Sequence, residues 1–421
     1  MPQDTIRKRP KIMSNTTLIV GFGAAGLSAA ESLRRSGYAG PLTILSGETH
    51  RPYDRPPLSK GFLTGKTSLE RLELASEARI SALDAAVHYG VRASHLDTVT
   101  RTVTDDRGAD HRYRTLIIAT GVRPRQLPDQ NLRGVHVLRD ITDAEALRES
   151  LQPGQRVTVI GGGFLGLEVA ATATQLGAVC TVIEPAPLPL AERLGEHTAE
   201  RLLALHTAHG VQVLPGTGVR SIVGGTDERT RPVDDSVDSS AGDVAHVVLD
   251  DGRVIDTDVV VVAIGSVPNT EWLEGSSLIV DNGVVCDSTC RAGDAEWAVG
   301  DVARWHHLTA DTRLRLEHRM NANEQAAHIA RGVLGSDEPF NPVPFFWTDQ
   351  FDAKIQFAGL KPAHASAEVV PGNVGSDSFV VVWRVDGELT GVLGWNATRE
   401  LMPYRRELAA SFRGTAAAEV T

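Results

Sequence analysis

The chain has 421 residues, of which 42% are hydrophobic and 23% charged, and its formal net charge is −11. This composition is typical of a globular protein, and the length suffices for two or three domains with separate cores. The longest apolar run, Val259 to Ile264, is too short to cross a membrane. Because the net charge is acidic and no basic stripe is interleaved with aromatic residues, we expect neither a nucleic-acid partner nor a membrane partner.

The N-terminus and the cysteines bear on location and on metal binding. Residues 1–13 carry several cations but no apolar core of the kind that a signal peptide needs, so we expect a disordered tail and a cytoplasmic protein. Cys180, Cys286 and Cys290 are too few for a disulfide scaffold and form no Cys-x-x-Cys pair. We predict plain thiols and no metal site.

The first motif is the glycine-rich turn that ends an apolar run near the N-terminus. Gly21 allows a tight turn, Gly23 lets the backbone approach a pyrophosphate, and Gly26 lets the next helix pack closely on the strand. Ala25 lies in the same turn. Glu48 follows the next predicted strand at about the distance at which an acidic residue meets a ribose hydroxyl. The turn predicts a dinucleotide site; a purely steric glycine turn and a solvated loop carboxylate are the alternatives.

A proline-rich segment from Arg51 to Lys60 follows. It holds too many prolines for a regular helix or strand, and it predicts a stiff, extended conformation. Such a segment can hold Arg55 and Lys60 at fixed positions beside an anionic ligand, although a purely structural proline loop is the alternative. Farther on, Glu70 to Leu83 is typical of a helix, and Thr115 to Gly121 of a short buried strand.

A second copy of the glycine turn follows the apolar run Val157 to Ile160. Gly161, Gly163 and Gly166 repeat the spacing, and Glu184 ends the next predicted strand. The pattern completes a second mononucleotide-binding half. A carboxylate placed where a 2′-phosphate would lie repels it by about 4 kcal/mol at ~4 Å and an effective dielectric constant of 20, before screening. We therefore predict that NADH is preferred to NADPH.

The rest of this half returns to the first pattern. Gly224 to Asp243 is rich in Asp, Ser, Thr and Gly, and it predicts a solvated hairpin excursion. A buried strand then ends at Gly265, as the earlier one ends at Gly121. Asp301 follows a third apolar run, where a carboxylate can accept hydrogen bonds from sugar hydroxyls; a turn aspartate is the alternative.

The residue pattern of the sequence changes at Phe340, where prolines mark a domain boundary. Strand-like segments follow, and Asp386-Gly387 between two apolar runs predicts a hairpin. A helix from Arg399 to Phe412 closes what we expect to be a small α+β domain.

Two such turns in one chain, with strands that end in Ala-Thr-Gly and Ala-Ile-Gly and a late Gly-Asp, resemble the two-dinucleotide-binding-domain flavoprotein superfamily. The segment Arg55 to Lys60 narrows the resemblance to the NADH-dependent ferredoxin reductases of oxygenase systems, and residues 315–325 and Pro344 to Gln350 look like two further segments of that family. The resemblance implies an α/β fold with two Rossmann-like dinucleotide-binding domains, as in glutathione reductase, and a small C-terminal α+β domain. The implied limits are 14–120 with 265–334 for an FAD-binding domain, 121–264 for an NAD-binding domain and 335–421 for the C-terminal domain.

The resemblance also assigns residues to the cofactors, with FAD on the first turn and NADH on the second. It places Glu48 at the adenosine ribose, Lys60 near the isoalloxazine and Asp301 on the ribityl chain. The other implied FAD contacts are Arg55, Ala93, Arg139 and Arg319, the last at a position where many relatives carry Trp. Gly265 completes the set of cofactor-binding candidates.

Lys60 and Glu168 are the candidate catalytic residues. The resemblance places Glu168 at a helix start, from which it would reach towards Lys60. Because either charge would be costly if buried alone, we expect the two to pair. Together they would hold the flavin edge and the nicotinamide in register.

The implied activity is hydride transfer from NADH to FAD, followed by transfer of single electrons to a [2Fe-2S] ferredoxin that serves a Rieske-type or cytochrome P450 oxygenase. Ferredoxins are commonly acidic, so we expect transient electrostatic docking on the basic residues near the flavin motif, unless these are ordinary surface charges. They are Arg304, Arg313, Arg315, Arg319, His306, His307 and His318.

Other activities of this fold remain as alternatives. A disulfide reductase is disfavoured because no cysteine lies between Gly26 and Gly121. A rubredoxin reductase, another NADH-dependent flavin oxidoreductase and a non-catalytic NADH-sensing flavoprotein stay open, as does the choice between a monomer and a homodimer.

Overall fold

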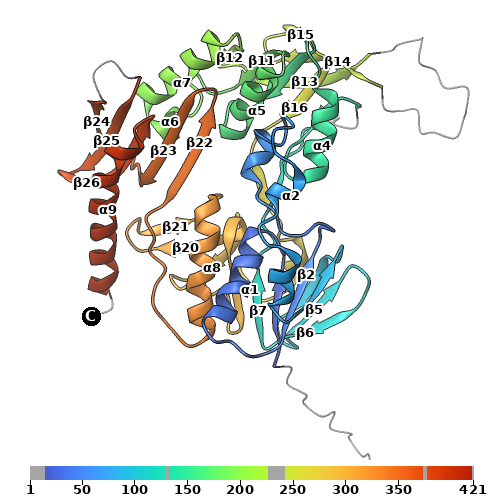
Figure 1. Cartoon of the computed structure of the whole chain (residues 1–421), viewed down its shortest axis with the longest axis vertical. Coiled ribbons are helices and arrows are strands. Elements are labelled where there is room, and N and C mark those ends of the chain that lie inside the picture. Colours follow the sequence, from blue (N-terminus) through green and yellow to red (C-terminus); the bar gives the residue numbers. More distant parts are fainter. Residues whose placement is uncertain (1–14, 129–131, 226–241, 373–376, 420–421) are drawn as a thin grey trace, which may run out of the picture.

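The computed structural model describes residues 15–128, 132–225, 242–372 and 377–419. Figure 1 shows two parallel sheets with their helices, one above the other, and an antiparallel sheet beside them. The arrangement confirms the expected fold class. The predicted N-terminal tail, residues 1–13, lies outside the described residues.

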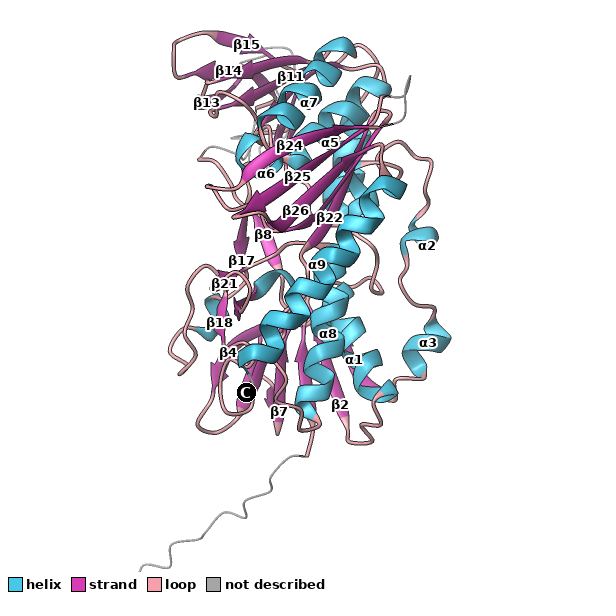
Figure 2. Ribbon diagram, turned by 90° about the vertical axis from the view of Figure 1, so that its left-hand side faces the viewer, coloured by secondary structure: helices cyan, strands magenta, loops and turns pink. Residues whose placement is uncertain are grey.

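The first parallel sheet draws on distant parts of the chain. Its strand order is β19-β7-β1-β2-β3. The strands are β1 (Thr17–Val20), β2 (Leu42–Ser46), β3 (Ala85–Tyr89), β7 (Thr115–Ile118) and β19 (Glu296–Ala298). The helices α1 (Ala24–Arg35) and α8 (Arg319–Val333) pack side by side on it (Figures 1 and 2). Every residue of β1 is buried, as expected for a strand covered on both faces.

Smaller elements surround this sheet. An antiparallel sheet of β4 (Ala93–Asp97), β5 (Thr102–Asp105) and β6 (Asp110–Arg112) shares its core. A second small sheet contains β18 (Val284–Cys286), β20 (Ala303–His307) and β21 (Thr312–Leu314). Short 3-10 helices cover Pro56–Ser59, Glu271–Leu273 and Gly300–Val302.

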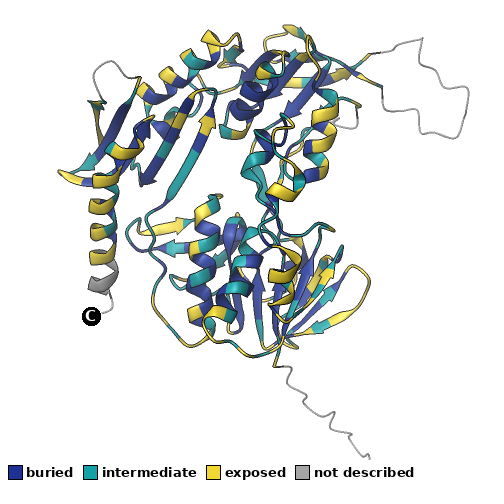
Figure 3. Cartoon of the chain, in the orientation of Figure 1, coloured by how far each residue is buried: buried dark blue, intermediate teal, exposed yellow. Residues whose placement is uncertain are grey.

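The second parallel sheet has the order β12-β11-β10-β16-β9. Its strands are β9 (Val135–His136), β10 (Arg156–Ile160), β11 (Val179–Glu184), β12 (Gln212–Pro215) and β16 (Val259–Val262). Its helices are α4 (Ile141–Ser150), α5 (Phe164–Gln175), α6 (Ala191–Leu194) and α7 (Glu196–Ala208). A three-stranded sheet of β13 (Val219–Gly224), β14 (Val244–Leu249) and β15 (Val254–Asp256) lies at its outer end. In Figure 3 the central strands of both parallel sheets are buried, whereas the edge strands β3, β9 and β12 are intermediate or exposed.

The two Rossmann-like units are joined by a crossing pair of strands. β8 (Val122–Pro124) leads out of the first unit, and β17 (Ser266–Pro268) leads back into it. The two pair antiparallel. The domain limits that we predict at 121 and 265 fall beside this pair.

The C-terminal unit is an antiparallel sheet in the order β22-β23-β26-β25-β24, packed against one long helix. The strands are β22 (Phe345–Gln350), β23 (Ala353–Gly359), β24 (Ser366–Pro371), β25 (Phe379–Val385) and β26 (Glu388–Trp395). The helix α9 (Thr398–Glu419) contains the predicted helix and extends beyond it. The predicted hairpin is present, because Asp386 and Gly387 both have positive φ and join β25 to β26.

Two local predictions are wrong. The expected helix over Glu70 to Leu83 is split into α2 (Leu69–Leu72) and α3 (Glu77–Ser81). The residues between them pair instead with the proline-rich segment, where the Asp54 N–H donates to the Leu72 carbonyl and the Leu74 N–H donates to the Pro52 carbonyl. That segment is also not extended throughout, because Pro56–Ser59 forms a 3-10 turn.

The three cysteines are free thiols, as predicted, and all three are buried. Most of the predicted excursion between β13 and β14 lies outside the described residues. Among the helices of the described ranges, none combines the length and the apolar character that a membrane span requires.

Candidate active site

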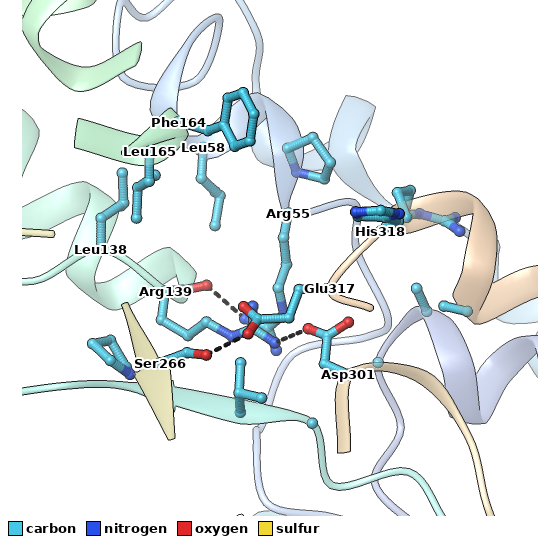
Figure 4. A pocket seen from close by; sticks show the side chains of 18 of the residues that line it. Arg55, Leu58, Leu138, Arg139, Phe164, Leu165, Ser266, Asp301, Glu317 and His318 are labelled. Atoms are coloured by element: carbon cyan, nitrogen blue, oxygen red, sulfur yellow. Dashed lines mark hydrogen bonds and ion pairs between the residues drawn. The ribbon is translucent and has the colours of Figure 1, made fainter. Parts of the chain in front are cut away.

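A cavity of about 650 Å³ lies where the three units meet. Both glycine turns line it, the first through Gly21 and Gly23 and the second through Gly163. β22 of the C-terminal unit adds Phe346 and Trp347. Figure 4 shows the apolar side chains on one side of this cavity and the charged groups on the other. The fold thus brings two sequence motifs that lie about 140 residues apart to a single space.

The first glycine turn is held by close backbone contacts. A side chain at Gly21, where φ is +106°, would place its Cβ 2.2 Å from the Ala119 carbonyl oxygen, and one at Gly26 would lie 1.9 Å from the Gly21 carbonyl oxygen. At Gly23 a Cβ would meet nothing within 4 Å. Gly23 caps α1 without a side-chain hydrogen bond, so the N-terminal N–H groups of this helix face open space that suits a pyrophosphate.

The second turn repeats this geometry around α5. A Cβ at Gly161, where φ is +108°, would lie 2.4 Å from the Ala263 carbonyl oxygen, and one at Gly166 would lie 1.9 Å from the Gly161 carbonyl oxygen. Gly163 caps α5 without a side-chain bond, and a Cβ there would again meet nothing within 4 Å. The same chemistry can therefore hold a second nucleotide.

The acidic residues that follow the second strand of each unit already have hydrogen-bond donors. Glu48 accepts a 2.5 Å bond from the Tyr53 hydroxyl and pairs with Arg55. Burial alone would raise the pKa of Glu48, but the Arg55 guanidinium and the Tyr53 hydroxyl lower it below its usual range. Glu184 accepts from the N–H groups of Gly162 and Ala186, at 2.7 and 2.8 Å. Glu184 is thus fixed next to the second turn and Glu48 is fixed on the proline-rich segment, and neither residue lines the cavity.

A polar network lines the lower part of the cavity. Arg139 pairs with Asp301 at 2.9 Å, and Arg55 donates to the Arg139 carbonyl oxygen at 2.7 Å (Figure 4). Asp301 belongs to the 3-10 helix that follows β19. Among the described residues, no group accepts a hydrogen bond from the buried Arg139 Nε. A partly buried guanidinium with an unused donor suits an anionic or hydroxyl-rich cofactor.

The expected pair of Lys60 and Glu168 is present at the cavity wall. The Lys60 ammonium lies 2.6 Å from a Glu168 carboxylate oxygen, and Glu168 is only 8% exposed. The Ser59 hydroxyl donates to the same carboxylate at 2.6 Å. Because Ser59 and Lys60 come from the proline-rich segment and Glu168 from α5, the pair joins the first unit to the second.

The start of α8 supplies Arg319 and His318. Arg319 lies 2.5 Å from Asp54 and donates to Asn323 at 2.7 Å. Burial and the nearby Arg193 lower the pKa of His318 to about 4, so its ring is neutral near pH 7. Both residues line the cavity.

Some predicted residues lie elsewhere or are neutralised. Ala93 begins β4 and does not line the cavity. His307 is fully buried and donates to the Pro342 carbonyl oxygen at 2.8 Å, so its inclusion among the basic surface groups is wrong. Arg304 pairs with Asp281, and Arg315 pairs with Glu317. The expected basic neighbourhood is therefore smaller than its sequence suggests.

Four polar residues of the site were not anticipated. Tyr53 and Asp54 hold Glu48 and Arg319, and their place beside Arg55 in the proline-rich segment was an available signal. The Ser266 hydroxyl donates to Glu317 at 2.5 Å across the cavity (Figure 4). No local pattern predicts that bond, because the two residues meet only through the return of the chain to the first unit.

Two protein-family models together match most of the chain. The model of pyridine nucleotide-disulphide oxidoreductases matches residues 15–326, and the reductase C-terminal model matches residues 345–420. The chain belongs to the pyridine nucleotide-disulphide oxidoreductase family. Members of this family use FAD and NAD(P)H, so these are the cofactors of the chain.

Individual relatives of this oxidoreductase are electron-transfer reductases. It is 36% identical to rhodocoxin reductase of Rhodococcus erythropolis, over 93% of this chain and 89% of the relative. It is 34% identical to the biphenyl dioxygenase system ferredoxin–NAD(+) reductase component of Paraburkholderia xenovorans, over 92% of this chain and 91% of the relative. The putidaredoxin reductase–putidaredoxin complex matches with a TM-score of 0.86 and 30% identity, over 94% of this chain and 93% of that one.

The glycine turns of this oxidoreductase yield a matched pair of substitutions. Gly23→Ala should leave the thermal unfolding midpoint of the FAD-free protein unchanged, since its methyl group meets nothing. It should weaken FAD binding at least about tenfold because it narrows the approach of the pyrophosphate. Gly26→Ala should lower the free energy of unfolding by about 1–3 kcal/mol through its clash with the backbone.

Fluorescence titration with FAD and calorimetry of the FAD-free protein measure these effects. Gly163→Ala, the corresponding change in the second turn, serves as the control and should leave FAD affinity unchanged. Wild-type FAD affinity in Gly23→Ala would contradict the assignment of the first turn.

Proposed function

We propose that the chain is an NADH-dependent ferredoxin reductase that passes electrons through FAD to a [2Fe-2S] ferredoxin of a Rieske-type or cytochrome P450 oxygenase system. The observation that carries the proposal is the single cavity lined by both glycine turns. The names of the relatives support a ferredoxin as the electron acceptor, since they include a dioxygenase ferredoxin reductase component and a reductase bound to putidaredoxin. A cytoplasmic location is part of the proposal, in keeping with three free thiols.

The chain's own residues bind and orient the two cofactors. FAD, when bound, accepts a hydride from NADH and releases the two electrons one at a time. The first turn and α1 hold its pyrophosphate, and Glu48 offers a carboxylate to its ribose. Arg139 and Asp301 supply a donor and an acceptor where the cavity is polar. The second turn and Glu184 hold NADH in the same way.

Lys60 and Glu168 keep the two cofactors in register. Hydride transfer needs no general acid, so the value of the pair lies in orientation and in a fixed charge next to the reacting rings. Phe164, Phe346 and Trp347 line the cavity nearby and limit the access of water.

Disulfide-reductase chemistry lacks its nucleophile here. None of the described residues that line the cavity is a cysteine. Cys286 and Cys290 are buried in the first unit, where burial raises the pKa of the Cys286 thiol to about 12. A thiol of this kind is largely protonated and unreactive at neutral pH.

Docking of the acceptor is expected to depend on cations around the cavity. Arg193 lines the cavity and Arg313 lies on β21, and neither forms an ion pair within the described residues. Both side chains are exposed. They can attract an acidic ferredoxin even though the whole chain is acidic.

The first prediction concerns the buried pair. Lys60→Gln and Glu168→Gln should each slow the reduction of bound FAD by NADH at least about tenfold, because each removes the charge that fixes its partner at the cavity wall. Stopped-flow absorbance of the flavin measures the rate. Arg156→Gln breaks an ion pair with Asp258 at the far end of the second sheet and serves as the control. Unchanged rates in both cavity variants would remove the proposed role.

The second prediction concerns nucleotide choice. The ratio of kcat/KM values should favour NADH over NADPH at least about tenfold, because Glu184 lies against the second turn, where a 2′-phosphate would approach. Glu184→Ala should narrow this ratio. Equal use of both nucleotides by the wild-type protein would refute it.

The third prediction tests the function directly. NADH-dependent reduction of cytochrome c should require added [2Fe-2S] ferredoxin, and the rate should fall as salt is raised from about 50 to 500 mM. Arg193→Gln should weaken the salt dependence. A colourless protein that takes up no FAD, or turnover with rubredoxin alone, would overturn the proposal. A rate insensitive to salt would overturn only the electrostatic docking.

A further inference from the structure

β22 buries two polar side chains that cofactor binding does not explain. Along this strand Phe346, Thr348 and Gln350 point to one face, because alternate residues of a strand share a face. Phe346 lines the cavity, while Thr348 and Gln350 are each only 1% exposed. Buried polar groups of this kind require partners.

Thr348 and Gln350 belong to a continuous series of hydrogen bonds that ends at Glu168. The Thr348 hydroxyl lies 2.6 Å from Glu168 Oε1, and Gln350 Nε2 lies 3.1 Å from the Thr348 oxygen. Gln350 Oε1 lies 2.7 Å from Nε2 of His206, a fully buried residue of α7. This series of hydrogen bonds therefore runs from the second unit through the C-terminal unit to the Lys60–Glu168 pair.

The carboxylate fixes the direction of every bond. An ionised Glu168 can only accept, so the Thr348 hydroxyl must donate to it and must itself accept from the Gln350 amide. The Gln350 oxygen then faces His206, whose Nε2 must carry the proton. Burial lowers the pKa of His206, which keeps the ring neutral, and its Nδ1 has no partner among the described residues. Each donor thus points towards Glu168.

This arrangement completes the set of donors around one carboxylate. Oε2 takes the Lys60 ammonium and the Ser59 hydroxyl, and Oε1 takes the Thr348 hydroxyl. Hydrogen bonds to a charged acceptor are stronger than neutral ones, and they fix its orientation as well. The plane of the carboxylate, and with it the position of the Lys60 ammonium, therefore depends on β22.

We propose that Thr348, Gln350 and His206 are positioning residues for the Lys60–Glu168 pair. The C-terminal unit takes part in hydride transfer through these residues, although none of the three touches either cofactor. The inference rests on the proposed function. It differs from a packing role because it requires the hydroxyl of Thr348, not only its volume.

The kinetic test removes that hydroxyl alone. Thr348→Val should slow the reduction of bound FAD at saturating NADH about tenfold and change the Kd of NADH less than about threefold. Thr348→Ser, which keeps the hydroxyl, should stay within about threefold of the wild-type rate. Thr390→Val removes a hydroxyl that donates to the Trp383 carbonyl oxygen in the same sheet, and it controls for general destabilisation. A Thr348→Val enzyme with the wild-type reduction rate would overturn the proposal.

A spectroscopic test does not depend on turnover. In ¹⁵N spectra of the oxidised holoenzyme at about pH 7, one of the 14 histidines should show the neutral Nε2–H form, and its signals should vanish in His206→Asn. Its signals should move in Thr348→Val but not in Thr390→Val. A protonated ring or the Nδ1–H form at His206 would refute the proposed direction of these hydrogen bonds. A wild-type protein that takes up no FAD would instead refute the proposed function.

Discussion

The ion pair of Lys60 and the buried Glu168 is the contact on which the rest of the site depends. The Glu168 carboxylate is removed from water at the junction of the proline-rich segment and α5, and a buried charge is stable only when it is paired and further hydrogen bonds satisfy it. Ser59 supplies one of those bonds from the proline-rich segment itself, and Thr348 supplies another from β22. The first unit, the second unit and the C-terminal sheet therefore meet at one carboxylate.

The repeated glycine turn explains why the two nucleotides share one cavity. In each unit the first and third glycines bring a helix against a strand, and the middle glycine leaves the helix N-terminus open. Both turns lie at the carboxyl ends of parallel strands, where ligands of such sheets bind. The crossing strands β8 and β17 join the two units beside this cavity, and both turns open onto it. Orientation of the cofactors thus follows from the fold, and few side chains are needed for the chemistry.

The C-terminal sheet contributes to this site in two ways. Phe346 and Trp347 line the cavity, whereas Thr348 donates to Glu168 and Gln350 donates to Thr348. All four residues belong to a single strand, β22, on which Phe346, Thr348 and Gln350 share one face. The surface around the cavity carries fewer free cations than its sequence suggests, since several arginines are paired with nearby carboxylates.

The sequence by itself determined the two βαβ units, the glycine turns, the hairpin at Asp386 and the closing helix, because each depends on local backbone and periodic side-chain patterns. It also led to Lys60 and Glu168, through the family resemblance of the segments that hold them. Only the tertiary structure decided which groups meet. The helix predicted over Glu70 to Leu83 is broken because the proline-rich segment pairs with its middle. His307 is buried by residues that follow it in the chain, and Thr348 meets Glu168 across 180 positions. Such pairings depend on long-range packing, which no local pattern of residues encodes.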